Sequence, residues 1–148
     1  MYSKTPIGYI DLRVFAHATE DEEKVLTAVR NILPNELSEA IIFQKNSVLG
    51  HHGNPILLIE AKLTDKKALP LVLTKIGEHL SSLDKESLER GIKLHLEKGN
   101  LYLRFDKQSA FLNEIVFSSN DPIHVKIHFQ NKTIEEIIDI CRETGLLP

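Results

Sequence analysis

The sequence has little of what marks disulfide-stabilised, secreted or membrane-spanning proteins. Its one cysteine, Cys141, cannot form an internal disulfide, which fits a reducing cytoplasm. No apolar run approaches the length that spans a membrane, and residues 1–6 lack the apolar stretch of a secretory signal. These absences predict a soluble, cytoplasmic protein that does not bind a membrane.

The chain also lacks the strong positive charge of many nucleic-acid-binding proteins. Its 18 lysines and arginines stand against 21 aspartates and glutamates, which gives a formal net charge of −3. Any anion-binding surface must therefore be local, with the acidic residues segregated elsewhere. The length of 148 residues predicts a single domain, residues 1–148, with a core that needs no disulfide or metal.

Sequence signatures of catalysis are missing as well. The chain has no nucleophile elbow, no phosphate-binding loop and no metalloprotease motif. Glu60, Asp106 and the histidines could form an acid–base pair, but no spacing requires one. Cys141 falls on the apolar stripe of the last expected helix, which indicates a packing role. We interpret the chain as a non-enzymatic protein and expect no cofactor.

Alternation of apolar and polar residues predicts most of the strands. The first covers residues 7–18, where every second residue from Ile10 to Ala16 is apolar. Six further strands are expected at residues 39–49, 56–64, 92–97, 101–106, 114–118 and 124–129. Glycine- or proline-containing segments, at residues 50–55, 98–100 and 119–122, would turn these strands into hairpins.

Two helices carry capping-box signatures. Thr19 and Glu22 should open the first helix, which ends before Pro34, and its acidic first turn favours the helix dipole. Thr133 and Glu136 should open the last helix, which ends at Gly145.

A third helical region is expected between residues 67 and 91. Proline is tolerated only in the first helical turn, so Pro70 places the start near Lys67. A buried stripe should then run from Leu69 to Leu83. Asp84 would cap a further short turn that ends at Gly91.

The order of these elements predicts an α+β fold. Strands and helices alternate in a way that gives a two-layer sandwich, with helices on one face of a mostly antiparallel, mixed sheet. In this arrangement Leu94 and Leu103 point toward the helices. The other face would be open and would carry Lys93, Tyr102 and Arg104.

The segment Gly50-His51-His52-Gly53-Asn54-Pro55-Ile56 is interpreted as a shaped turn. Neighbouring residues of an extended chain point to opposite faces, so His51 and His52 should not converge on one metal ion. His124 and His128 are also too far apart, at about 13 Å along a strand. We therefore expect no metal. A histidine that holds the turn is the simpler explanation, and a metal-dependent hydrolase at this loop is the alternative.

Basic and aromatic residues at outward strand positions favour RNA binding. Cations engage phosphates, and exposed rings stack on unpaired bases. The residues of this kind are Arg13, Phe15, Lys62, Lys93, Tyr102, Arg104 and Lys126. Acidic residues share the same positions, so cross-strand ion pairs on a solvated face explain the pattern equally well. A protein–protein adaptor that uses this polar face is therefore a second hypothesis.

Four motifs then decide between these hypotheses, and they occur in order along the chain. They are His17-Ala-Thr-Glu-Asp-Glu, Gly50-His-His-Gly-Asn-Pro-Ile56, Tyr102-Leu-Arg-Phe-Asp-Lys-Gln108 and Asp121-Pro-Ile-His-Val125. Together they resemble the archaeal family described as RNA-binding proteins or predicted exosome subunits. The resemblance implies a fold like that of a ribosomal protein and brings no catalytic residues.

The expected function is therefore that of an RNA-binding protein, as an accessory factor in RNA processing or exosome-linked degradation. Its expected partners are RNA and, through the resemblance, exosome or ribosome-related proteins. The candidate RNA-contacting residues are Arg13, His51, His52, Asn54, Tyr102, Arg104, Lys107, Gln108 and Lys126.

Overall fold

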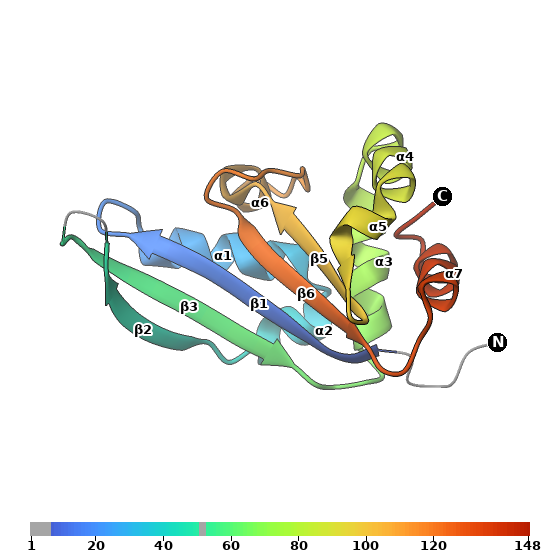
Figure 1. The fold of residues 1–148 in the computed structure, drawn as a ribbon. Helices are drawn as coiled ribbons and strands as arrows, with labels where there is room; N and C mark the ends of the chain where they lie inside the picture. Colours follow the sequence, from blue (N-terminus) through green and yellow to red (C-terminus); the bar gives the residue numbers. More distant parts are fainter. Residues whose placement is uncertain (1–6, 51–52) are drawn as a thin grey trace.

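A computed structural model describes residues 7–50 and 53–148, and its centre is one six-stranded antiparallel sheet (Figure 1). The spatial order of the strands is β2-β3-β1-β6-β5-β4. Their bounds are β1 (Ile7–His17), β2 (Gln44–Leu49), β3 (Pro55–Leu63), β4 (Leu96–Glu97), β5 (Asn100–Phe105) and β6 (Ile123–Phe129). The predicted α+β fold with an antiparallel sheet is confirmed.

Several helices cover one face of the sheet and others lie at its ends and edges, so that the other face is left open (Figure 1). Their bounds are α1 (Glu22–Ile32), α2 (Asn35–Ala40), α3 (Leu69–His79), α4 (Ser82–Arg90), α5 (Ile92–His95), α6 (Lys107–Phe111) and α7 (Ile134–Thr144). None of the helices in the described residues has the length and apolar character to cross a membrane.

The core lies between the sheet and helices α1 and α3. Strand β1 sends every second side chain inward, and these residues are at most 5% exposed: Ile10, Leu12, Val14 and Ala16. Burial of each isoleucine, leucine or valine side chain stabilises the fold by roughly 1.5–3 kcal/mol. The strand period predicted from the sequence is therefore confirmed. The same alternation directs the intervening residues of β1 to the open face.

The N-terminal half differs from the sequence prediction at two places. Thr19 does not cap α1; Asp21 is the N-cap, and its carboxylate accepts a hydrogen bond from the Glu23 amide at 3.0 Å. The strand predicted from residue 39 begins only at Gln44, because Pro34 starts the short helix α2, which includes Glu39. Proline with its fixed φ suits the start of a helix, and this local effect outweighs the apolar pattern that follows.

The predicted long helix stripe ends earlier than expected. Leu69 and Leu80 are buried, but Leu83 is 76% exposed. The chain turns at Ser81, whose hydroxyl accepts a hydrogen bond from the Asp84 amide and so caps the separate helix α4. Asp84 is therefore not the cap, while the predicted end at Gly91 is confirmed.

Residues 92–97 are not a full strand. Ile92–His95 form the helical turn α5, and β4 has only two residues. Leu94, predicted to point inward, is 91% exposed because the helical turn rotates it away from the core. Residues 100–105 form β5, and β5 pairs with β4 as the predicted hairpin requires, although only over two residues. Its pairing with β6 along the whole strand was not predicted.

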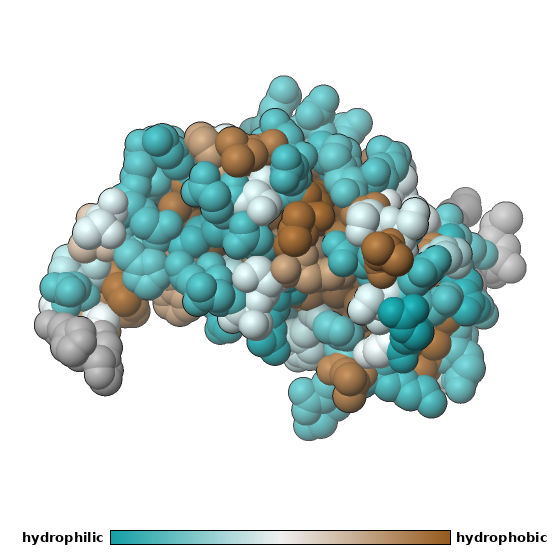
Figure 2. Space-filling model, turned by 90° about the horizontal axis from the view of Figure 1, so that it is seen from above, coloured by the Kyte–Doolittle hydropathy of each residue, from teal (hydrophilic) through white to brown (hydrophobic). Residues whose placement is uncertain are grey.

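The strand predicted at residues 114–118 is also absent. This segment touches the sheet through a single bridge between Phe117 and Phe105, whose rings stack at 5.3 Å. Val116 and Leu112 remain exposed. Seen from above, apolar side chains interrupt the hydrophilic surface over this part of the molecule (Figure 2).

Candidate nucleic-acid interface

The open face of the sheet is crossed by two rows of directly paired residues. The first row consists of Glu60 on β3, Arg13 on β1, His124 on β6 and Arg104 on β5. The second row consists of Lys62, Asp11, Lys126 and Tyr102, on β3, β1, β6 and β5. Paired residues on one face lie about 5 Å apart, so each row forms a continuous polar line across the strands.

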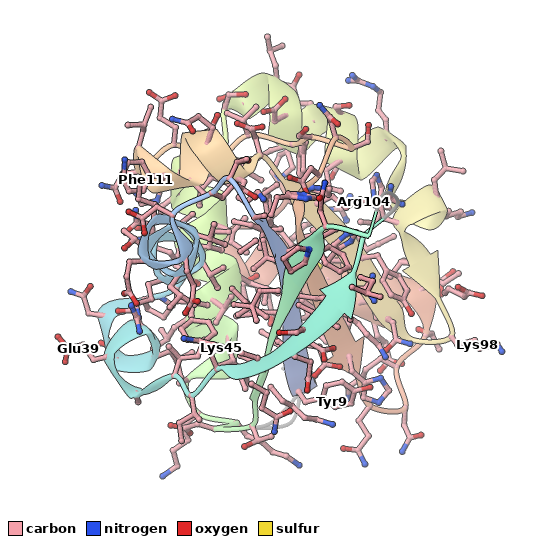
Figure 3. The ribbon with its side chains drawn as sticks, turned by 90° about the vertical axis from the view of Figure 1, so that its left-hand side faces the viewer. Tyr9, Glu39, Lys45, Lys98, Arg104 and Phe111 are labelled. Atoms are coloured by element: carbon pink, nitrogen blue, oxygen red, sulfur yellow. The ribbon has the colours of Figure 1, made fainter. Side chains whose placement is uncertain are left out.

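A groove of about 1060 Å³ runs over both rows. Ile42 and Gln44 line one side of it, and residues 94–97 of α5 and β4 line the other. Figure 3 shows Arg104 on the side of the sheet opposite to α1. The short strand β4 and the helical turn α5, which replaces the first part of the strand predicted at residues 92–97, thus supply one wall of the groove.

The groove is more positive than the molecule as a whole. Four basic residues line it, Arg13, Lys62, Arg104 and Lys126, and none of them forms an ion pair with another described residue. Three acidic residues line it too: Asp11, Glu60 and Glu97. With neutral histidines the lining carries one net positive charge, whereas the whole chain carries −3. The charge segregation expected from the sequence is therefore present but modest.

Tyr9 anchors two of these cations at the edge of the groove. Its ring stacks on His128 with centroids 4.7 Å apart. Lys62 and Lys126 place their amines 4.2 and 5.5 Å from the ring centroid. The hydrogen bond with the Tyr9 side chain raises the pKa of Lys126, which stays protonated at any physiological pH. Because Tyr9 is engaged in this way, Tyr102, which is 37% exposed, is the ring that the groove offers for stacking on a base.

His124 is the central group of the first row. Burial lowers its pKa, and the positive charges of Arg13 and Arg104 lower it further, against an opposing effect of Asp121. Its pKa therefore lies below the ordinary 6.5, and the imidazole is neutral at pH 7. From the sequence, His124 was considered only as a metal ligand together with His128, not as part of a basic row.

Lys107 holds a second polar cluster together, next to the end of β1. Its amine donates to the Phe15 carbonyl at 2.7 Å and to the carboxylates of Glu20 and Asp121 at 2.9 Å each. The Lys107 side chain is only 11% exposed. All three ammonium donors thus have acceptors within the protein.

His17 belongs to the same cluster, and three of the four sequence motifs meet there. Its Nε2 atom lies 3.1 Å from Asp121 Oδ2, and its amide donates to Glu20 Oε1. Partial burial acts to raise the pKa of Asp121, but its bonds to Lys107 and His17 outweigh that effect and leave the pKa below 3.8. The sequence analysis missed this cluster, although three separate motifs each contribute a charged or polar member to it.

The predicted RNA-contacting residues fall into separate places. Arg13, Tyr102, Arg104 and Lys126 come together in the groove. Gln108 lines a smaller hollow of about 390 Å³ between α1 and α6, together with Lys107. Asn54 is exposed at the turn between β2 and β3. His51 and His52 lie outside the described residues.

The Lys107 cluster also contains three potential metal ligands. His17, Glu20 and Asp121 place ligand atoms within 4.8 Å of one another. The Lys107 amine already bridges the two carboxylates, so a cation would have to displace it. Within the part of the chain that the structure describes, this is the one histidine–carboxylate group of this kind. The absence of a metal remains a prediction.

Comparison with known proteins shows which family this chain belongs to. A family model described as RNA binding matches residues 9–129, which include most of β1, both rows of the groove and the Lys107 cluster. The chain belongs to this RNA-binding family. The resemblance seen in the four motifs is thereby confirmed.

Individual relatives agree with this assignment. RNA-binding protein PAB1135 of Pyrococcus abyssi is 38% identical over 130 residues, which cover 86% of this chain and 84% of that protein. Uncharacterized protein MJ0213 of Methanocaldococcus jannaschii is 34% identical over 132 residues, or 84% of this chain and 85% of that protein. The solved structure of Mth689, a DUF54 protein from Methanothermobacter thermautotrophicus, is 31% identical and has a TM-score of 0.72. That match covers 96% of this chain and 98% of the other.

Proposed function

We propose that this protein binds RNA without catalysing a reaction, and that the groove on the open sheet face is its RNA-binding surface. The observation that carries the proposal is the convergence of Arg13, Lys62, Arg104 and Lys126 from four strands in one groove of an otherwise acidic chain. Basic side chains without an ion-pair partner are available to phosphate groups. Tyr102 adds a ring on which an unpaired base can stack.

Within the groove, we expect Arg104 and Lys126 to contribute most of the affinity for RNA. Arg104 and Lys126 lie on the neighbouring strands β5 and β6, two residues apart in register, so both can reach one stretch of RNA backbone. Phosphate contacts of this kind position the RNA without reading its sequence. We therefore expect binding that depends strongly on salt and weakly on base identity.

Charge reversal of this pair tests the proposal. In the double variant Arg104→Glu/Lys126→Glu, affinity for single-stranded RNA should fall at least tenfold, or about 1.4 kcal/mol. The slope of log affinity against log salt should decrease by about 1.4, since two phosphate contacts are lost. Fluorescence anisotropy across a salt series measures both quantities.

A matched control changes the same number of charges elsewhere. Lys66 and Lys67 are exposed in the loop before α3 and do not line the groove. The variant Lys66→Glu/Lys67→Glu should bind RNA within about threefold of the wild type, because it lies outside the contact surface. Equal losses in both double variants would show a general charge effect and would contradict the assignment to the groove. Failure of the wild type to bind any RNA would instead favour the adaptor hypothesis.

The proposal extends to an accessory role in RNA processing, including exosome-linked degradation, in the cytoplasm. Its support is the resemblance carried by the four sequence motifs, together with the lack of catalytic signatures in the sequence. Crosslinking in cells, followed by sequencing of the recovered RNA, tests it. Recovery of processing intermediates is expected, whereas RNA that merely mirrors cellular abundance would overturn this part of the proposal.

A further inference from the structure

The first row of the groove has a feature that general RNA binding does not require. Two arginines flank a histidine on three adjacent strands, with Arg13 and Arg104 each paired directly with His124. All three residues line the groove. Both guanidinium groups are always charged, and neither forms an ion pair among the described residues. The row therefore presents one fixed positive charge on each side of a titratable ring.

We propose that Arg13, His124 and Arg104 form a phosphate-binding site, and that His124 takes up a proton from solvent when a phosphate group of RNA occupies it. This inference rests on the proposed function and adds the chemistry of one subsite. Planar guanidinium groups match phosphate oxygens in geometry. An imidazole at the floor between them donates a hydrogen bond to the same anion, and the protonated ring adds a third positive charge.

The direction of the proton linkage follows from the charges around His124. In the free protein, burial and the two arginines disfavour the protonated ring, so its pKa is lowered. An anion between the arginines offsets their repulsion and favours the charged ring, which raises the pKa in the complex. Affinity must then increase as the pH falls through the higher pKa of the complex, and level off below the lower pKa of the free protein.

Other charged groups also lie near the His124 ring. Asp121 lies before β6 and acts to raise the pKa of His124 in the free protein. Lys126 lies two residues along β6, and Glu60 on β3 is the register partner of Arg13 at the end of the same row, without an ion pair between the two. His95 on α5 lines the same groove and also carries an imidazole, but it is not flanked by the arginines. His95 therefore supplies the matched control.

The first test follows the His124 side chain directly. The imidazole resonance of His124 is titrated between pH 5 and 8.5 by NMR, in the free protein and with saturating single-stranded RNA. We expect its pKa to rise by about one unit on RNA binding, which corresponds to a tenfold gain in affinity across the pH window. RNA that binds with a normal salt dependence but leaves this pKa unchanged would overturn the inference while the proposed function stands.

The second test uses variants. Over the same pH range the wild type should gain about tenfold in RNA affinity as the pH falls. His124→Gln should show a flat profile in this window, because the amide donates a hydrogen bond but takes up no proton. His95→Gln should keep the profile of the wild type. A pH dependence that survives in His124→Gln, or that disappears in His95→Gln, would overturn the assignment to His124.

The source of the phosphate is distinguished by two oligonucleotides of one sequence, with and without a 5′-phosphate. Equal pKa shifts of His124 indicate an internal phosphodiester, and a shift seen only with the 5′-phosphorylated strand indicates a terminal phosphate. If the wild type binds neither oligonucleotide, the proposed function fails. Sulfate, whose charge is constant in this pH range, then tests the site alone: a raised pKa of His124 in sulfate supports an anion site, and an unchanged pKa overturns it.

Discussion

The Lys107 amine lies 2.9 Å from a carboxylate oxygen of Asp121, although the two residues are on opposite sides of a long loop. Lys107 starts α6, and Asp121 precedes β6. The same amine also reaches the carbonyl of Phe15 at the end of β1. One largely buried ammonium therefore ties two turns to the end of a central strand, next to the groove that carries the proposed RNA contacts.

Loss of this ammonium should destabilise the fold. Lys107→Met keeps much of the aliphatic stem but leaves Glu20 and Asp121 without their shared cation. We expect the free energy of unfolding to fall by about 1–3 kcal/mol, as for other partly buried charges that lose a partner. Urea denaturation measures it. The control Lys45→Met removes an exposed pair with Glu22 and should cost less than about 1 kcal/mol. A Lys107→Met protein as stable as the wild type would contradict this stabilising role of the Lys107 ammonium.

Acid should weaken the same cluster in a defined pH range. The pKa of Asp121 is lower in the folded protein than its ordinary value of 3.8, so the unfolded chain binds more protons between the two values. The stabilisation is complete above pH 3.8 and is lost as the pH falls through the folded pKa. Asp121→Asn should therefore be less stable than the wild type near pH 6, and the difference should shrink below pH 3.8. A difference in melting temperature that stays constant down to about pH 3 would speak against this linkage.

The two glycines of the β2–β3 turn should respond to substitution for different reasons. Gly53 has a φ of +76°, with open space where a Cβ would lie, so Gly53→Val should cost about 1 kcal/mol or more through backbone strain. At Gly50 a Cβ would lie 2.6 Å from Ile56 Cδ1. Gly50→Ala should therefore regain stability in combination with Ile56→Val, whereas Gly53→Ala should not. Thermal melts of Gly53→Val, and of Gly50→Ala and Gly53→Ala each with and without Ile56→Val, test this. Unchanged melting temperatures in all five variants would show that the turn tolerates side chains at both positions.

Cys141 should be chemically inert in the folded protein. The residue is fully buried on α7, and burial raises the pKa of its thiol from 9.0 to about 12. The thiolate is the reactive form, so iodoacetamide at about pH 8 should leave the native protein unmodified and alkylate it rapidly in denaturant. Mass spectrometry gives the modified fraction over time. Comparable rates in both states would mean that the thiol is accessible.

No stoichiometric metal should accompany the purified protein. The spacing of His51 and His52 fits no ligand set, and Lys107 neutralises the carboxylates that lie beside His17. Metal analysis after purification without chelator checks this. One zinc per chain retained through dialysis would overturn the prediction. Loss of that zinc in His51→Ala or in Asp121→Asn would identify the histidine loop or the Lys107 cluster as its site.

Local sequence patterns predicted the elements whose side chains repeat with a clear period. The alternation from Ile10 to Ala16 and the capping box of Thr133 and Glu136 were both read correctly. Errors occurred where two local signals compete within a few residues. Ser81 starts a new helix inside an apolar helical stripe, and Leu94 falls in a single helical turn that resembles a strand in sequence.

By itself, the sequence determined that one sheet face would be polar, because strand side chains alternate with a period of two and Arg13, Arg104 and Lys126 fall on the outward positions. It also carried the motifs that belong to the RNA-binding family. Only the tertiary structure decided which of these groups meet. The pairing of β1 with β6 and of β6 with β5 places His124 between Arg13 and Arg104. The packing of three loops places Lys107 inside the protein rather than at the groove. Strand order and loop packing depend on contacts between residues far apart in the chain, which no local pattern contains.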